Sequence, residues 1–259
     1  MSTKQAVSER QPDRATVDQT GLQTSLPDYV ASLALNHSSY WAFSNYKSVV
    51  TELSRIRHAG TIMEIGAGRS PLFEDGEIAR MGVKYILNDI SDVELSHSCR
   101  EAERAHFDIA DPDAAEIERL RGQVDLMFSY MVFEHVSDAR ASYVNIHKLL
   151  SPAGICINFH PTLFALPFLI NRLLPISASE MLTRRIWKSE EKPKFPAYYD
   201  RCWVSRTSRD FLLSLGFSQA WQLPFWHHSY FQFDRWLNTL AERANWTALA
   251  AYCFTIVVK

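Results

Sequence analysis

The chain has 259 residues with 29 acidic and 27 basic side chains, so its formal charge is −2. This near balance argues against a dedicated nucleic-acid-binding protein, because contacts with phosphates require clustered lysines and arginines. Hydrophobic residues make up 47% of the chain, enough for the core of one large domain or two small ones. We therefore expect a folded protein without a nucleic-acid partner.

The sequence predicts no membrane-spanning segment. The longest apolar run, Leu163–Ile170, is far shorter than the roughly 20 residues that a transmembrane helix needs. Residues 1–25 are polar and mixed in charge, without the apolar centre of a secretory signal, and we expect them to form a disordered tail. These features favour a cytoplasmic protein and leave peripheral contact with a membrane open.

The four cysteines are scattered along the chain and form no CxxC pair, which is typical neither of a zinc site nor of a disulfide framework. They are Cys99, Cys156, Cys202 and Cys253. We expect them to be small buried hydrophobic residues, and the sequence predicts no metal site.

The first regular elements alternate between helix and strand. Apolar residues at helical spacing predict an amphipathic helix from Ser38 onward, with Gly60 as its stop. Two short apolar runs, Thr61–Ile65 and Lys84–Asn88, are typical of buried strands. The segment between them, Ser70–Met81, is long enough for a helix.

The same rhythm continues along the chain. His106–Asp108 predicts a third strand, and Asp111 can cap a helix that runs to about Arg121. Val124–Tyr130 is a strong strand candidate, followed by a helix that Ser137 can cap.

Pro152 and Gly154 end that helix, and Ile155–Phe159 is the fifth expected strand. Strands that alternate with helices at these lengths predict a parallel sheet covered on both faces, because parallel neighbours need a crossover helix. The fold class is therefore α/β, with a doubly wound, mostly parallel, seven-stranded, Rossmann-like sheet in one domain over residues 26–259.

The rhythm breaks after the fifth strand. Residues 161–205 mix prolines with apolar, basic and aromatic residues, and we expect an aromatic helical insertion there. A helix over Ser208–Leu215, a strand over Phe217–Leu223 and a last strand over Ala251–Val258 follow. A second aromatic segment, residues 224–250, precedes the last strand.

A glycine-rich turn follows the first expected strand and predicts a ligand site. Gly66 and Gly68 let the backbone turn sharply, and they let a ligand approach without meeting a Cβ atom. Three successive strands, ending near Glu64, Asp89 and Asp108, bring an acid to this same edge of the sheet. A carboxylate at the position of Asp89 can accept hydrogen bonds from both hydroxyls of a ribose.

The loop departs from the fingerprint of nicotinamide dinucleotide enzymes. Pro71 occupies the position of the third glycine in GxGxxG, and the acidic Glu64 is unfavourable beside a pyrophosphate. A cationic or neutral cofactor is therefore favoured, and an NAD(P)-dependent oxidoreductase remains an alternative.

The motifs in this region resemble those of class I S-adenosylmethionine-dependent methyltransferases. Glu64-x-Gly66-x-Gly68-x-Ser70 is similar to their first motif, with Ser70 where a third glycine is usual. The run Asp125–Val136, which closes with Glu134-His135-Val136, looks like their fourth motif in small-molecule members, and Leu149–Gly154 resembles the turn before their fifth strand. The resemblance covers about residues 55–160 and implies that S-adenosylmethionine is the cofactor.

The resemblance also implies a cofactor-binding set. The glycine loop would contact the methionyl and ribose parts, Asp89 the ribose hydroxyls, Asp108 and Ile109 the adenine, and Ser129 with Tyr130 the methionine end. The full set is Glu64, Gly66, Ala67, Gly68, Asp89, Ile90, Asp108, Ile109, Ser129 and Tyr130.

Methyl transfer requires a base only when the acceptor is a hydroxyl or a protonated amine. His135 and His160 are the candidates, because each follows the carboxyl end of a strand and imidazole titrates near neutral pH. His135 also has a purely structural interpretation as part of the turn. Glu134 could hold a metal ion, but no second ligand is clustered with it.

The last third of the chain predicts the acceptor side. Its aromatic side chains form either an acceptor pocket or a satellite core, and the basic residues of the insertion (Arg184, Arg185, Lys188, Lys192 and Lys194) either attract an acidic acceptor or are solvated. The runs Asn171–Pro175 and Phe195–Cys202 look like segments of methyltransferases of bacterial cell-surface glycan pathways. This second resemblance implies a sugar hydroxyl as acceptor, with Tyr199 or Asp200 near it.

The predicted function is therefore O-methylation of a small-molecule or glycan acceptor. A non-catalytic interaction protein that retains the fold, with its aromatic segments as a partner or membrane-surface patch, is the alternative from another class. The sequence leaves the acceptor and the oligomeric state open.

Overall fold

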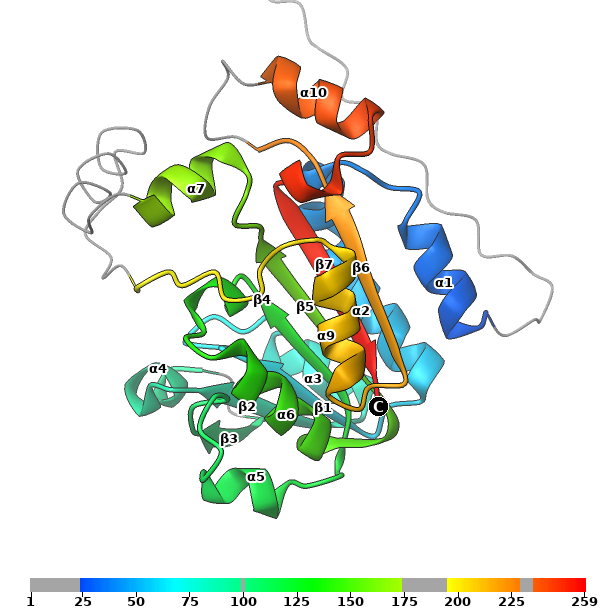
Figure 1. The fold of residues 1–259 in the computed structure, drawn as a ribbon. Coiled ribbons are helices and arrows are strands. Elements are labelled where there is room, and N and C mark those ends of the chain that lie inside the picture. Colours follow the sequence, from blue (N-terminus) through cyan, green and yellow to red (C-terminus); the bar gives the residue numbers. More distant parts are fainter. Residues whose placement is uncertain (1–23, 99–100, 174–194, 229–234) are drawn as a thin grey trace, which may run out of the picture.

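The computed structural model describes residues 24–98, 101–173, 195–228 and 235–259, and its centre is a seven-stranded sheet (Figure 1). The strand order is β3-β2-β1-β4-β5-β7-β6, and all neighbours are parallel except those of β7. This confirms the predicted doubly wound, mostly parallel sheet. The strands are β1 (Thr61–Ile65), β2 (Lys84–Asp89), β3 (Glu103–His106), β4 (Val124–Tyr130), β5 (Leu150–Pro161), β6 (Gln219–Phe225) and β7 (Tyr252–Val258).

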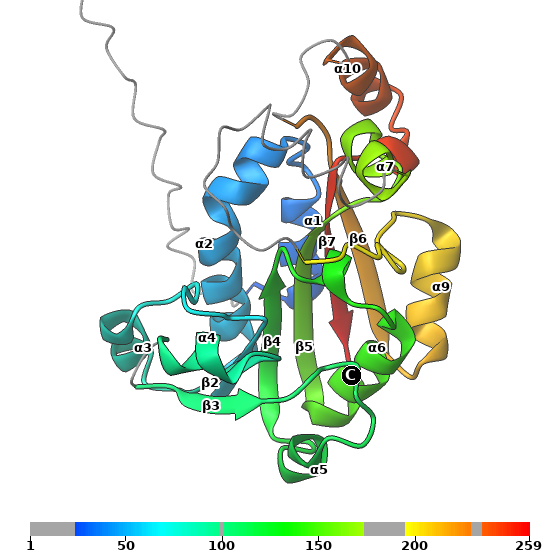
Figure 2. The same ribbon diagram turned by 90° about the vertical axis from the view of Figure 1, so that its left-hand side faces the viewer.

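Helices cover both faces of the sheet. Figure 2 shows α2 and α3 on one face and α6 and α9 on the other. The helices are α1 (Leu26–Leu33), α2 (Ser39–Arg57), α3 (Asp75–Met81), α4 (Asp92–Ser96), α5 (Ala115–Arg119), α6 (Ala139–Leu149), α7 (Leu166–Leu173), α9 (Arg206–Ser214) and α10 (Arg235–Arg243), with short 3-10 turns η1 (Phe133–His135) and η2 (Thr247–Leu249).

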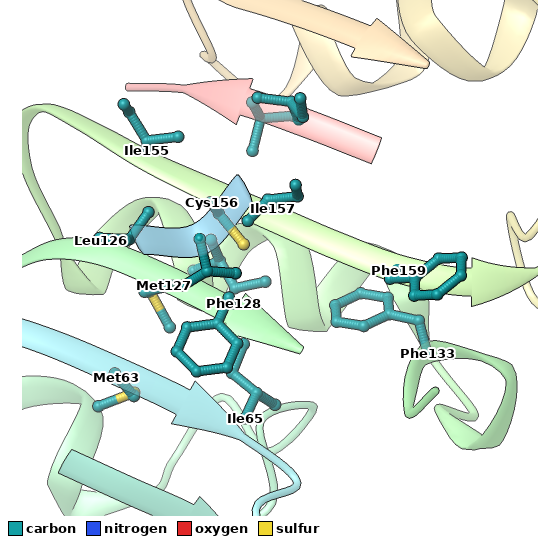
Figure 3. Close-up of a cluster of buried hydrophobic side chains, with 14 of the residues drawn as sticks. Met63, Ile65, Leu126, Met127, Phe128, Phe133, Ile155, Cys156, Ile157 and Phe159 are labelled. Atoms are coloured by element: carbon teal, nitrogen blue, oxygen red, sulfur yellow. The ribbon is translucent and has the colours of Figure 1, made fainter. Parts of the chain in front are cut away.

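The middle strands β1, β4 and β5 form the centre of the core (Figure 3). They read as nearly continuous apolar runs rather than alternating ones because helices bury both of their faces. Met63, Met127 and Ile157 are completely buried on three adjacent strands. This packing holds the carboxyl ends of these strands in a fixed mutual position.

Several predicted boundaries moved because side chains cap the helices at other residues. The helix expected over Ser70–Met81 begins at Asp75, where Glu74 and Glu77 form a capping box, and residues 70–74 extend the loop. The helix assigned to a Ser137 cap begins at Ala139 and is capped instead by Asp138, whose carboxylate accepts from the backbone N–H of Ala141 at 2.9 Å.

Two other expectations were wrong in detail. The third strand ends at His106, so Asp108 lies two residues beyond it. Asp111 does not cap α5, which starts at Ala115, because its carboxylate accepts from Asp113 N at 2.9 Å in a local turn.

Some features had no predicted counterpart or fall outside the structure's scope. Helices α1, α4 and α10 were not expected. Most of the expected tail and the centre of the insertion, with its basic residues, lie outside the described residues. Within the described ranges, no helix is long and apolar enough to span a membrane. Cys156, Cys202 and Cys253 are buried free thiols as predicted, whereas Cys99 lies outside the described part.

Candidate active site

The glycine loop leaves β1 with two residues in the left-handed region, Gly66 (φ +69°) and Gly68 (φ +54°). Between them, Ala67 donates its N–H to the carbonyl of Asn88 at 3.0 Å, which ties the loop to the end of β2. A Cβ atom added to Gly68 would meet one carboxylate oxygen of Asp89 at 3.8 Å and no other atom of the described residues within 4 Å. Gly68 therefore presents bare backbone beside a carboxylate.

Gly66 has a different environment. A Cβ atom at this position would lie 2.5 Å from a methyl group of Val132, the second residue after β4. The glycine is thus required by close packing against Val132, a residue of the expected fourth motif to which the sequence assigned no role. A ligand reaches this loop from the side of Gly68 rather than through the space that Val132 fills.

Asp89 ends β2 and is anchored to the loop by its own side chain. Its Oδ2 accepts from Gly68 N and its Oδ1 from Ser91 N, each at 2.9 Å. A carboxylate oxygen can accept more than one hydrogen bond, so both oxygens retain capacity for ligand hydroxyls. The carboxylate is therefore oriented beside the exposed backbone of the loop before any ligand binds.

The acids at the neighbouring strand ends lie along the same edge of the sheet. Asp108 is exposed, and its Oδ1 accepts from Ala110 N at 2.8 Å, whereas Ile109 next to it is 4% exposed. Ile90, directly after Asp89, is 61% exposed. This arrangement places apolar side chains and carboxylates together beyond β2 and β3.

Glu64 serves the loop rather than an open surface. It is buried, and its carboxylate accepts from Leu72 N at 2.9 Å and from the Tyr85 hydroxyl at 2.7 Å. Burial raises the pKa of Glu64 to about 7, although these hydrogen bonds and Lys47 oppose the shift. The Glu64 side chain thus ties the loop to the end of β1 through its hydrogen bond with Leu72 N.

At the end of β4, the two predicted residues differ. Ser129 is buried, its hydroxyl donates to Asn158 Oδ1 at 2.9 Å, and its carbonyl accepts from the hydroxyl of Tyr46 at 2.6 Å. Tyr130 is 37% exposed and packs edge-on against Phe43. Ser129 therefore braces the strand, and Tyr130 forms part of the surface at its end.

The turn η1 places His135 with a defined tautomer. Its Nδ1 lies 2.8 Å from the carbonyl oxygen of Pro196, which can only accept, so Nδ1 carries the proton in the neutral ring. The other nitrogen, Nε2, then holds a lone pair, lies 3.9 Å from Glu134 Oε1, and belongs to a side chain that is 36% exposed. The contact with Pro196 therefore fixes the orientation of the imidazole ring.

Glu134 beside it is buried and uncharged near neutral pH, because burial raises its pKa to about 8. Its Oε2 has no hydrogen-bond partner among the described residues. Its backbone carbonyl accepts from Tyr198 N at 2.7 Å and from Tyr199 N at 3.1 Å. No group of three metal-ligating side chains occurs in the described ranges.

His160 lies inside the sheet instead of at its edge. Its Nδ1 is 3.0 Å from the Pro161 carbonyl and its Nε2 is 3.0 Å from the Thr255 hydroxyl, so both nitrogens are engaged. It is 2% exposed, and burial lowers its pKa to about 4. The geometry matches a neutral core histidine that links β5 to β7.

The run Phe195–Cys202 clamps the Glu-His turn in place. Besides the contacts of Pro196 and the two tyrosine N–H groups, Asp200 Oδ2 accepts from Ala139 N at 2.9 Å at the start of α6. Tyr199 is 3% exposed. Tyr199 and Asp200, predicted near the acceptor, therefore have structural contacts. No local pattern linked this run to His135, whose partner Pro196 is 61 positions away.

Comparison with known proteins finds one domain match. Residues 63–158, from β1 to β5, match the family model described as a methyltransferase domain. Among curated protein sequences no match was found. The domain match, together with the fold, supports a methyltransferase enzyme with S-adenosylmethionine as its cofactor.

Solved structures share this fold at low sequence identity. The citrinin polyketide synthase CMeT domain has a TM-score of 0.54 at 13% identity, and the CurJ carbon methyltransferase 0.52 at 16%. The alignments cover 90% of this chain and 57% and 58% of those two chains. A methyltransferase from Archaeoglobus fulgidus has a TM-score of 0.48 at 17% identity, covering 86% of this chain and 100% of its own.

The residues at the carboxyl edge fit the cofactor of this class. Asp89 offers two oriented oxygens for ribose hydroxyls, and Gly68 offers unshielded backbone beside them. Exposed Ile90 and Tyr130 provide apolar surface on either side of the loop. The ligand-binding groups are thus one carboxylate and exposed backbone. A carboxylate suits a nucleoside with a cationic sulfur better than a pyrophosphate, which it would repel.

Proposed function

We propose that this enzyme methylates a hydroxyl group of a small-molecule or glycan acceptor, with His135 as the general base. The observation that carries the proposal is the Nδ1 contact of His135 with the Pro196 carbonyl, which leaves the Nε2 lone pair at a partly exposed position beyond β4. His160 is unsuited to this role because both its nitrogens are engaged inside the sheet.

The proposed cofactor site comprises the glycine loop and the strand ends around it. Gly66, Ala67 and Gly68 supply backbone, Asp89 receives the ribose hydroxyls, and Ile90, Asp108 and Ile109 surround the adenine. Glu64 and Ser129 act by holding the loop and β4, and Tyr130 forms the wall toward the acceptor. When bound, S-adenosylmethionine supplies a methyl group activated by its positively charged sulfur.

The chain's own residues then have two tasks. The packed strand ends hold donor and acceptor in line, and such positioning can be worth roughly 7–11 kcal/mol of the barrier. His135 Nε2 would accept the proton of the acceptor hydroxyl as its oxygen displaces sulfur from the methyl carbon, and the carbon–sulfur bond electrons would leave with the cofactor as a neutral thioether. Because Nδ1 stays bonded to the Pro196 carbonyl, the ring keeps the orientation that this proton transfer requires.

The experiment compares His135→Asn with His135→Ala. Asparagine can place an N–H donor where Nδ1 lies and so retain the contact with Pro196, but it has no counterpart of Nε2. If His135 is the base, kcat of both variants falls about 10²–10⁴-fold, while their affinity for S-adenosylmethionine is unchanged. If the residue is only structural, His135→Asn retains activity while His135→Ala loses it.

The acceptor is sought with labelled cofactor and panels of free sugars, glycans and phenols. NMR of the product shows whether the new methyl group is on oxygen, nitrogen or carbon. Methylation on carbon or nitrogen with full activity of His135→Asn would contradict the proposal.

A further inference from the structure

Helix α10 turns an apolar face outward. Trp236 and Leu240 lie one helical turn apart, and they are 68% and 45% exposed. The buried face of the same helix holds Asn238 and Ala241. Of the three large apolar side chains of α10, Leu237 is half-buried, but Trp236 and Leu240 face solvent, where a surface helix usually presents polar groups.

Positive charge surrounds this face. Arg235 and Arg243 stand exposed at the two ends of α10, and no ion pair of theirs occurs within the described ranges. The helix's acid, Glu242, is hydrogen-bonded to His227 at 2.9 Å. The outward face of α10 therefore combines apolar and cationic groups, with its carboxylate already engaged.

A second helix repeats this combination at the same end of the molecule. Leu173 at the end of α7 is 74% exposed beside the exposed Arg172, and α7 contains no acidic residue. Figures 1 and 2 both show α7 and α10 at the end toward which β4 and β5 point. The apolar, cationic surface thus lies at the edge of the sheet that carries the candidate active site.

We propose that α10 binds the surface of an anionic membrane, with Trp236 and Leu240 inserted at the lipid interface and Arg235 and Arg243 at the lipid phosphates. Tryptophan and leucine flanked by arginine are the groups that interfacial helices use, and each arginine near an anionic surface adds attraction. The binding does not depend on the proposed acceptor chemistry.

A second copy of the chain fits this face less well. The helix has nine residues, so it is about 14 Å long and about 10 Å across, far too small for the roughly 800 Å² per partner of a stable dimer. Two such faces would also bring like charges together. A bilayer needs no matching shape and supplies the opposite charge.

The test measures cosedimentation of the full chain with vesicles of phosphatidylcholine alone and of phosphatidylcholine with phosphatidylglycerol. We expect binding to the anionic vesicles that weakens with salt, and at least tenfold weaker binding for the double variant Trp236→Ser, Leu240→Ser. The variant Arg235→Gln, Arg243→Gln should lose the salt dependence.

The matched control is Leu35→Ser, Tyr40→Ser, because these side chains are more exposed, at 81% and 80%, but lie near α1 and the start of α2. Unchanged thermal melting confirms that each variant is folded. The proposal is overturned if the native chain ignores anionic vesicles, or if the control pair weakens binding as much as the α10 pair. It is also overturned if light scattering shows a dimer that the α10 variant abolishes while vesicle binding persists.

Discussion

The half of the sheet from β1 to β4 and the part of the chain after β5 differ in what carries their function. In the first half, glycine turns and carboxylates lie at the strand ends, and the methyltransferase-domain match, residues 63–158, covers these strands and ends within β5. In the second half, contacts join segments about 60 residues apart, such as Pro196 with His135. We expect the first half to bind the cofactor and the second to shape the acceptor site.

The largest expected effect tests the backbone half. Gly66→Ala forces a Cβ atom to within 2.5 Å of Val132 at φ +69°, and overpacking together with left-handed strain should cost about 2–4 kcal/mol of unfolding free energy. Gly82→Ala is the matched control, since φ of Gly82 is +63° but an added Cβ atom would meet no atom of the described residues within 4 Å. This variant should lose only about 1 kcal/mol of unfolding free energy.

Denaturant unfolding measures the free energy of unfolding of both single variants and of the double variant Gly66→Ala, Val132→Ala. The double variant should recover part of the loss, since its valine methyl groups are gone. Equal destabilisation at Gly66 and Gly82 would show that packing against Val132 is unimportant.

The next effect concerns cofactor binding. Asp89→Ala removes both oriented oxygens and should weaken S-adenosylmethionine binding about tenfold, equivalent to about 1.4 kcal/mol. Isothermal titration measures it, with Asp108→Ala as the more exposed comparison that should lose less. If Asp89→Ala bound S-adenosylmethionine as tightly as the native chain, Asp89 would not be the residue that contacts the ribose.

In the half after β5, Asp200→Ala tests the clamp. This variant removes the acceptor for Ala139 N at the start of α6, which should cost about 1 kcal/mol, the usual size of a lost helix cap. Because the clamp also holds Pro196 against His135, kcat should fall with little change in cofactor affinity. If cofactor affinity fell as much as kcat, the clamp after β5 would also support the cofactor site, and the two regions would not be functionally separate.

The smallest effect is a pH dependence. The pKa of Glu134 is raised from 4.5 to about 8, so the folded state keeps a proton that the unfolded state releases, and stability should fall as pH rises through this window. Glu64 contributes in the same direction up to about pH 7, and His160 contributes in the opposite direction between about pH 4 and 6.5. Between pH 7 and 8, Glu134 therefore dominates among these three.

Glu134→Gln should remove that fall, which is at most about 1 kcal/mol between pH 7 and 8. Urea unfolding at the two pH values measures it in both proteins. If the unfolding free energies of the native chain and of Glu134→Gln changed equally between pH 7 and 8, a group other than Glu134 would cause the pH dependence.

Local sequence predicted much of the first half because its signals are short-range. Both β1 (Thr61–Ile65) and β4 (Val124–Tyr130) begin and end where the apolar runs predicted, since a strand buried on both faces is mostly apolar. The glycine loop and Asp89 were likewise visible, because strand ends at one sheet edge follow from the alternation of elements. Helix starts were less predictable, since several side chains near each start could cap it.

The sequence by itself determined the class of fold and the edge of the sheet where glycines and carboxylates gather, because both follow from periodicity and from residues near one another in the chain. Tertiary structure decided the surroundings of the two candidate histidines. The sequence predicts each just after a strand, but His160 lies within β5 and is enclosed by β7, whereas Pro196 orients His135 beyond the end of β4. Contacts between distant segments leave no local pattern, and burial sets the protonation of such groups only once the chain has folded.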